Sequence, residues 1–221
     1  MGHKVLYIHG MGGGADSRIP GILRERFAAE GDGIEVIVRT YDFDPETGFA
    51  QIASWVDELK PELIVGESLG ANHAIAIKGL PHILVSPALN APAYFGRLAG
   101  LCFIPGVTSF LDNKFHPKPG ERQCLHFSYS TMKKYRYLRR KAKENTPLNG
   151  SKDRFFAFFG TQDHYRKSGV VSIRTWKKYF GENSFQTYPG THFMEEEWVI
   201  SLLMPKIREE ITIFAGRKRK K

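Results

Sequence analysis

Short apolar runs alternate with longer segments of helical periodicity along the chain. The apolar runs are residues 4–9, 34–41, 63–65, 82–85, 155–159 and 185–188. The periodicity predicts helices over residues 20–29, 47–59, 68–78, 170–180 and 195–214. Strands that alternate with helices are typical of βαβ units, which build parallel sheets. The pattern therefore predicts an α/β fold in which a six-stranded parallel sheet lies between two helical layers.

Residues 90–152 interrupt this alternation, because they separate two predicted strands by much more than an ordinary loop. Their second half carries Tyr129, Met132, Tyr135 and Leu138 near helical spacing among basic residues. We interpret the segment as a cap over the carboxyl edge of the sheet and expect Tyr129 and Tyr135 to contact substrate. The alternative is an ordinary crossover helix with a long surface loop.

Length and composition favour one domain. The 221 residues, 42% of them hydrophobic, can bury one sizeable core, which we place in residues 1–216, before a basic tail at 217–221. No apolar run approaches the roughly 20 residues that cross a bilayer, and no signal peptide is recognisable. Cys102 and Cys124 fit neither a metal knuckle nor a disulfide framework. We expect a cytoplasmic protein with no membrane partner.

The formal net charge is +9, and much of the excess lies in residues 133–143 and 217–221. A solvated helix face and a frayed tail explain both segments, and a surface for an anionic ligand is the alternative. We do not expect nucleic acid among the partners. Because the sequence contains no H-E-x-x-H, cysteine knuckle or P-loop motif, we expect neither a metal nor another cofactor. The sequence leaves the oligomeric state open.

The sequence GESLG at residues 66–70 follows a predicted strand and opens a predicted helix. A nucleophile elbow has this order, with Ser68 at the apex of a sharp turn and a glycine on each side where a Cβ atom would obstruct the chain. The motif itself is weak, since chance produces it in roughly one chain in ten of this size. Its position between strand and helix favours Ser68 as a nucleophile.

A serine nucleophile needs a base, and the base needs an acid that orients it. Asp163 follows the predicted strand 155–159, and His192 follows the next strand, 185–188. Both strands end at the carboxyl edge, where α/β sheets place their sites, and the order Ser, Asp, His is that of nucleophile-elbow enzymes. Taken singly, Asp163 could be a turn or capping residue and His192 an ordinary loop histidine. Their shared position favours a catalytic triad.

The sequence HGMGGG at residues 9–14 follows the first strand. We expect the backbone amides of Met11 and Leu69 to form an oxyanion hole, and His9 and Gly10 to contact substrate. The same glycines fit a relaxed dinucleotide fingerprint, G-x-G-x-x-A. Pro20 lies where the fingerprint's helix should already be running, and no acidic residue ends the second strand. We therefore keep dinucleotide binding only as a minor alternative.

With these motifs in place, the chain resembles the α/β-hydrolase superfamily, and within it the small YqiA-like esterases. The resemblance covers almost the whole chain except the basic tail. It implies a sheet that lacks the superfamily's first two antiparallel strands, in the order 2-1-3-4-5-6, and a serine esterase that forms an acyl-enzyme. In that mechanism Ser68 attacks, His192 moves the proton and Asp163 orients His192. The long basic cap departs from the resemblance.

The sequence thus predicts a serine hydrolase that cleaves a small-molecule carboxylic ester or thioester. A binding protein that keeps the fold without catalysis is the main alternative, since function depends on the site and not on the fold.

Overall fold

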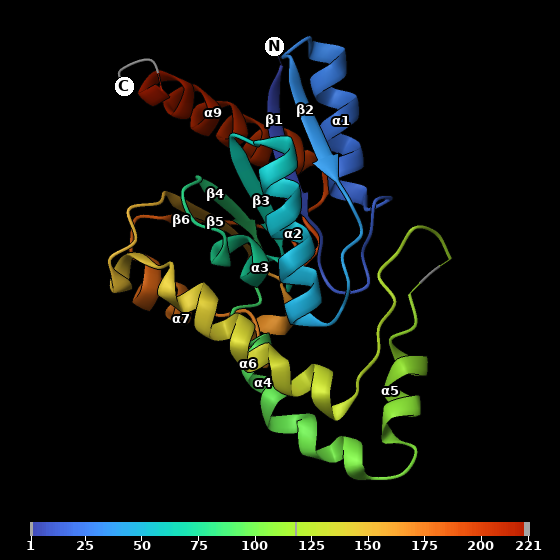
Figure 1. The fold of residues 1–221 in the computed structure, drawn as a ribbon. Coiled ribbons are helices and arrows are strands. Elements are labelled where there is room, and N and C mark those ends of the chain that lie inside the picture. Colours follow the sequence, from blue (N-terminus) through green and yellow to red (C-terminus); the bar gives the residue numbers. More distant parts are fainter. Residues whose placement is uncertain (1, 118, 219–221) are drawn as a thin grey trace.

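The computed structural model describes residues 2–117 and 119–218. Within them, one sheet contains the strands β1 (His3–Ile8), β2 (Ile34–Val38), β3 (Leu63–Glu67), β4 (His82–Val85), β5 (Phe155–Gly160) and β6 (Phe185–Tyr188). Neighbouring strands are parallel throughout, and their order is β2-β1-β3-β4-β5-β6. The predicted fold class and strand order are confirmed (Figure 1).

Helices cover both faces of the sheet. Outside residues 90–152 they are α1 (Arg18–Glu30), α2 (Pro45–Leu59), α3 (Gly70–Ala76), α7 (Ile173–Phe180), α8 (Glu196–Trp198) and α9 (Met204–Lys218). Alternate residues of β1 enter opposite cores, as the two-residue period of a strand requires. Val5 and Tyr7 pack with α1 and the C-terminal helices, whereas Leu6 and Ile8 pack on the side of α2 and α3.

Local chemistry explains several helix boundaries. Asp44 caps α2 by accepting hydrogen bonds from the amides of Glu46 and Thr47, and Pro45 follows at the first helical position. The helix predicted from residue 68 begins only at Gly70, because Ser68 belongs to the preceding turn. The predicted helix 195–214 contains a π-helical turn, η4 (Val199–Leu203), just before Pro205. Proline has no amide hydrogen to donate, which explains the local widening.

The segment 90–152 contains α4 (Ala91–Leu98), α5 (Val107–Lys114), α6 (Tyr129–Glu144) and the 3-10 turns η1 (Ala99–Phe103) and η2 (Pro147–Asn149). We call residues 90–152 the insertion. Helix α6 packs against α2, α3 and α4, and buries Met132, Tyr135 and Leu138 in the core. Figure 1 shows α4 and α5 beyond the carboxyl ends of the strands. The insertion therefore combines a crossover helix with a helical extension.

No helix in the described residues is long and apolar enough to cross a membrane. Of the predicted basic tail, residues 217 and 218 continue α9, and residues 219–221 lie outside the described residues.

Candidate active site

Ser68 occupies the turn between β3 and α3 with a φ angle of +49°, in the left-handed region that a serine rarely adopts. The flanking glycines make this turn possible. A Cβ on Gly66 would lie 2.7 Å from the Cβ of Ala74, and one on Gly70 would lie 2.2 Å from the carbonyl oxygen of His9. The turn therefore has the tight strand-to-helix geometry of a nucleophile elbow.

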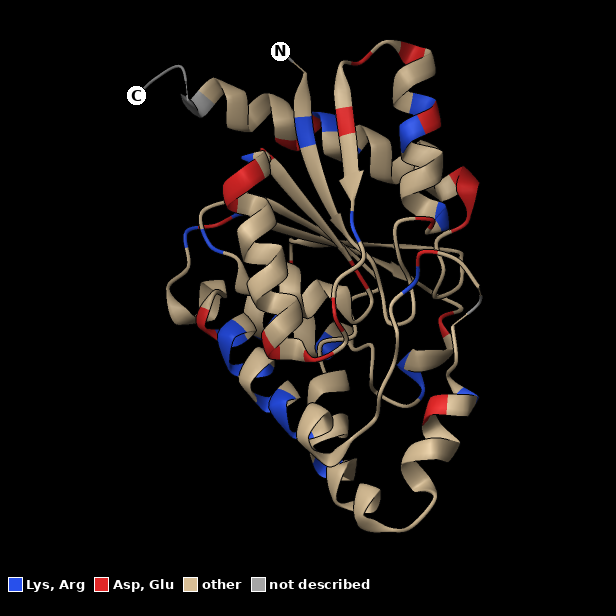
Figure 2. Ribbon diagram, turned by 45° about the vertical axis from the view of Figure 1, so that its right-hand side comes forward, with Lys and Arg blue, Asp and Glu red and all other residues tan. Residues whose placement is uncertain are grey.

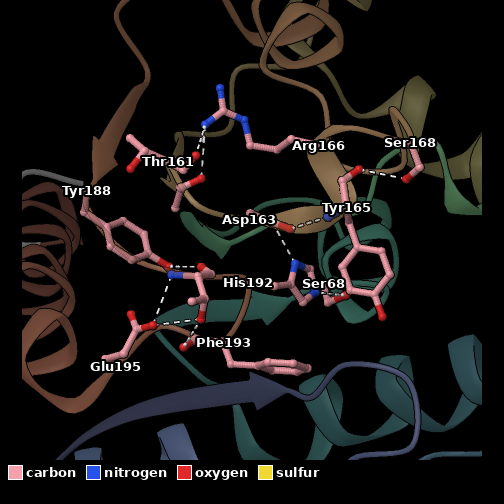
Figure 3. Close-up of polar contacts among 12 residues, drawn as sticks. Ser68, Thr161, Asp163, Tyr165, Arg166, Ser168, Tyr188, His192, Phe193 and Glu195 are labelled. Carbon is pink, nitrogen blue, oxygen red and sulfur yellow. Dashed lines mark hydrogen bonds and ion pairs between the residues drawn. The ribbon is translucent and has the colours of Figure 1, made fainter.

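Ser68, His192 and Asp163 form one hydrogen-bonded chain, drawn in Figure 3. Nε2 of His192 lies 2.9 Å from Oγ of Ser68, and its Nδ1 lies 2.8 Å from Oδ2 of Asp163. A carboxylate only accepts hydrogen bonds, so the imidazole proton belongs on Nδ1 and Nε2 is left to accept from the serine hydroxyl. Asp163 and His192 are both 3% exposed, which shields this chain from water.

Asp163 has two structural roles at once. Its Oδ1 accepts a hydrogen bond from the amide of Tyr165 at 2.8 Å, which caps the short turn after β5, while Oδ2 meets His192. The two interpretations that the sequence left open, a capping residue and a partner of the histidine, therefore both apply. Capping fixes the carboxylate in the orientation that His192 needs.

The loops after β5 and β6 are packed directly on each other. A Cβ on Gly160 would lie 2.2 Å from the carbonyl oxygen of Thr191 and 2.4 Å from that of Gly190. On the His192 loop, Oε1 of Glu195 accepts hydrogen bonds from the amide and the hydroxyl of Thr191. Backbone contact thus sets the relative position of Asp163 and His192.

The glycine loop after β1 lies against Ser68, and a Cβ on Gly10 would lie 3.2 Å from the Cβ of Ser68. The amides of Gly12, Gly13 and Gly14 donate to Oε1 of Gln123, the Gly10 carbonyl and Oγ of Ser17. Within the described residues, the amides of Met11 and Leu69 make no hydrogen bond. The two amides that the sequence predicts for an oxyanion hole thus have no hydrogen-bond partner within the described residues.

Comparison with solved structures finds the same architecture in several proteins. A monoacylglycerol lipase from Paleococcus ferrophilus aligns with a TM-score of 0.60 at 16% identity, covering 96% of each chain. The esterase Est1E from Butyrivibrio proteoclasticus, with ferulic acid bound, gives 0.63 at 18% identity over 95% of this chain and 90% of its own. Mouse α/β-hydrolase domain-containing protein 10 gives 0.63 at 15% identity, over 95% and 89%. The chain has the α/β-hydrolase fold.

No family model and no curated protein matches the sequence. The resemblance to the YqiA-like branch of the α/β-hydrolases therefore stays a prediction. The shared fold alone assigns no reaction, because one fold supports many chemistries.

A second carboxyl group, that of Glu67, directly precedes Ser68 in the chain. It accepts a hydrogen bond from the hydroxyl of Tyr7 at 2.8 Å. Burial raises the pKa of Glu67, and this effect outweighs those of the Tyr7 hydrogen bond and of the electrostatic interactions with His192 and Arg18, which lower it. The carboxylate that contacts His192 is that of Asp163, so Glu67 is not its orienting acid.

Two of the predicted substrate contacts are corrected by the structure. Tyr135 is completely buried, and its hydroxyl donates to the carbonyl of Phe43, because α6 turns this face toward the core. His9 is also buried and stacks on Tyr41 at 4.4 Å between ring centroids, and burial lowers its pKa to about 4. Both side chains support the fold and are closed to substrate.

The other two predicted substrate contacts, Gly10 and Tyr129, lie in different parts of the molecule. Gly10 lies against Ser68, as described above. Tyr129 is 37% exposed and packs on Phe103 within the insertion, with 4.6 Å between ring centroids. Its contact with substrate stays a prediction.

Sequence reasoning missed three residues near the site. Tyr165 and Phe193 place their rings beside His192, at 4.6 and 5.2 Å between centroids, and both are partly exposed. Their positions in the sequence, two residues after Asp163 and one residue after His192, could have predicted their place near the site. Gln123 is buried and binds the glycine loop through Gly12 and Gly13 and the Tyr41 carbonyl through Nε2. No motif marks Gln123, because its partners are distant in the sequence.

The site does not favour either dinucleotide binding or metal binding. The carbonyl oxygen of Glu121 lies where a Cβ on Gly14 would be, at 1.8 Å, and α1 begins only at Arg18. Chain from the insertion therefore covers the glycines that a dinucleotide phosphate would approach. In the described residues, no group of three or more His, Cys, Asp or Glu side chains is arranged to hold a metal ion.

Proposed function

We propose that this protein is a serine hydrolase that cleaves a carboxylic ester or thioester through an acyl-enzyme. The observation that carries the proposal is the continuous hydrogen-bonded chain from Ser68 through His192 to Asp163 at the carboxyl edge of the sheet. This arrangement joins a nucleophile, a base and an acid that orients the base.

In the first half of the reaction, Oγ of Ser68 attacks the substrate carbonyl carbon while Nε2 of His192 takes the hydroxyl proton. Asp163 stabilises the resulting imidazolium through Nδ1. The tetrahedral intermediate collapses as His192 returns the proton to the departing alcohol or thiol. Water then repeats the sequence on the acyl-enzyme, which releases the acid and restores Ser68.

The free amides of Met11 and Leu69 are suited to bind the negative oxygen of both tetrahedral intermediates. Because they are backbone groups in packed loops, they need no reorientation during the reaction. Removing one such donor typically costs 100- to 1000-fold in rate, or about 3 to 4 kcal/mol.

The side chains beside His192 favour a small-molecule substrate with an apolar part. Tyr165 and Phe193 offer ring surface next to the base. The similar solved proteins include a monoacylglycerol lipase and an esterase with ferulic acid bound, which act on or bind molecules of this kind. Their chemistry agrees with an ester substrate here.

A fluorophosphonate probe, which reacts only with an activated serine, tests this proposal directly. We expect stoichiometric labelling of the wild type at one residue and none of Ser68→Ala. Ser86→Ala is the matched control, because Ser86 also has a positive φ angle (+45°), is buried and directly follows the neighbouring strand β4. It should keep full labelling.

Hydrolysis of short-chain p-nitrophenyl esters should follow the labelling in all three proteins. An unlabelled wild type would favour the non-catalytic binding protein, and labelling that survives Ser68→Ala would disprove the assigned nucleophile.

A further inference from the structure

The far end of the insertion exposes large apolar side chains that a soluble domain normally buries. We call these residues the apolar tip: Leu98, Leu101, Phe103, Ile104 and Phe110. Each is between 47% and 71% exposed. Figure 1 places the tip between α4 and α5, beyond the carboxyl ends of the strands. An exposed apolar patch of this kind commonly marks an interaction surface.

The apolar tip is held in its position by neighbours that face inward. Cys102 Sγ and Thr108 Oγ1 both donate to the carbonyl of Phe127, and Phe115 packs on the Phe127 ring at 5.4 Å between centroids. Inward residues thus fix η1 and α5, while the intervening apolar residues point to solvent. The exposure is therefore built into a packed segment.

The insertion also carries an excess of positive charge. It contains twelve lysine and arginine residues against three aspartate and glutamate residues, whereas the rest of the chain contains twenty of each kind. A groove of about 740 Å³ between α4 and α6 is lined by Arg97, Arg136, Arg139, Arg140 and Lys143. Figure 2 shows basic positions along α6, which leads to the tip.

Cations also border the tip itself. Lys114 Nζ lies 5.7 Å from the ring centroid of Phe110. Lys133 Nζ lies 5.5 Å from that of Tyr129, which packs on Phe103. Asp112, the acidic residue closest in sequence to the tip, is paired with His126 and accepts a hydrogen bond from the amide of Phe127. The tip thus combines apolar side chains with a cationic border.

We propose that the apolar tip docks on an anionic lipid surface, with its side chains in the acyl region and the surrounding cations on lipid phosphates. An interfacial segment needs both features, since apolar burial and attraction to anionic headgroups act together. A nucleic acid backbone offers no apolar layer for Phe103 and Phe110. A second copy would bring two positively charged insertions together.

This proposal does not depend on the proposed hydrolase activity. The proposal differs from the prediction of no membrane partner, which we based only on the absence of an apolar run long enough to cross a bilayer.

Sedimentation with phospholipid vesicles tests the proposal on the full chain. Vesicles of phosphatidylcholine alone are compared with vesicles containing about one third phosphatidylglycerol, at low and high salt. We expect the wild type to bind the anionic vesicles at least about tenfold more tightly and to lose that advantage in high salt. Phe103→Ser/Phe110→Ser should weaken this binding by at least about tenfold.

Two further variants separate the contributions. Leu148→Ser is the matched control, because Leu148 is 56% exposed but lies past the other end of α6, and its binding should stay within about twofold of the wild type. Lys114→Gln/Lys133→Gln removes the two cations that border the tip, and it should weaken binding to anionic vesicles while leaving the weak binding to neutral vesicles unchanged. Circular dichroism melting establishes that every variant is folded.

Equal binding to neutral and anionic vesicles, or full binding by Phe103→Ser/Phe110→Ser, would overturn the proposal. A wild type that binds neither kind of vesicle would also overturn the proposal. If that wild type were a dimer in gel filtration and the tip variant a monomer, the tip would be an interface between copies of the chain. Salt-sensitive binding to single-stranded RNA in place of vesicles would assign the basic surface to nucleic acid.

Discussion

The carboxyl edge of the sheet and the apolar tip of the insertion differ in which side chains they expose to water. At the edge, Asp163 and His192 are buried and paired, and the loops that carry them meet through backbone atoms at Gly160. At the tip, large apolar side chains such as Phe103 are exposed, and charged side chains border them. One region excludes water from polar groups, and the other presents apolar groups to it.

The difference indicates two separate tasks. Under the proposed function, backbone packing at the edge fixes the distances between Ser68, His192 and Asp163, which catalysis needs to within a fraction of an ångström. The tip needs only a surface of suitable polarity, so its individual positions are less constrained. Substitutions at the edge should therefore have large effects on rate or stability, and matched substitutions in the insertion should have small ones.

The largest expected effect follows from Asp163→Asn. The amide favours the wrong tautomer of His192, so ester turnover should fall by about 10⁴-fold while the fold is retained. Asp153→Asn is the control, since Asp153 binds Asn145 and the amide of Gly79, away from His192. Steady-state kinetics should show turnover within about twofold of the wild type for this control. An Asp163→Asn enzyme that keeps a tenth of the wild-type rate would remove Asp163 from the mechanism.

Gly160→Ala tests whether backbone packing positions the two loops. The added methyl group would meet two carbonyl oxygens, so unfolding in urea should show a loss of about 2 to 3 kcal/mol, and turnover should fall as the loops separate. Gly100→Ala in the insertion is the counterpart, because a Cβ added at Gly100 would meet no neighbouring atom within 4 Å. It should change stability by less than about 0.5 kcal/mol. Equal losses in the two variants would contradict the difference drawn between the regions.

The smallest expected effect per residue is a loss of stability in acid. Burial lowers the pKa of His73 to about 3 and that of His9 to about 4. In the unfolded chain a histidine titrates near 6.5, so below that pH the unfolded state binds protons that the folded state does not. The free energy of unfolding should therefore fall from about pH 6.5 downward, by about 2 kcal/mol per histidine at pH 5.

Urea unfolding at pH 7 and pH 5 measures this loss. His73→Leu should reduce the acid sensitivity, because leucine does not bind a proton. The replacement breaks no hydrogen bond, since the ring nitrogens of His73 have no hydrogen-bond partner among the described residues. His116→Gln is the control in the insertion, where the histidine is exposed, and it should leave the acid sensitivity unchanged. Identical pH dependence in wild type and His73→Leu would refute this explanation.

Short apolar runs in the sequence were sufficient to predict the six strands, because the central strands bury side chains on both faces. The order of the strands was predicted from the resemblance to the α/β-hydrolases and not from the runs themselves. Element ends were less predictable. The helix expected from residue 68 begins at Gly70, because the left-handed turn at Ser68 is set by close contact of Gly70 with the chain at His9. The side-chain direction of Tyr135 was also beyond the sequence, since apolar spacing on α6 does not tell which neighbour covers it.

By itself, the sequence determined which residues end each strand, and parallel strands bring those ends to one edge. For that reason Ser68, Asp163 and His192 were predicted to lie together, and the structure places them in hydrogen-bond contact. Only the tertiary structure decided which amides stay free and what supports them. Gln123 binds Gly12 across 111 positions, and such a contact leaves no local periodicity to read. The exposure of Phe103 was decided in the same way, by the absence of a covering element within the described part of the chain.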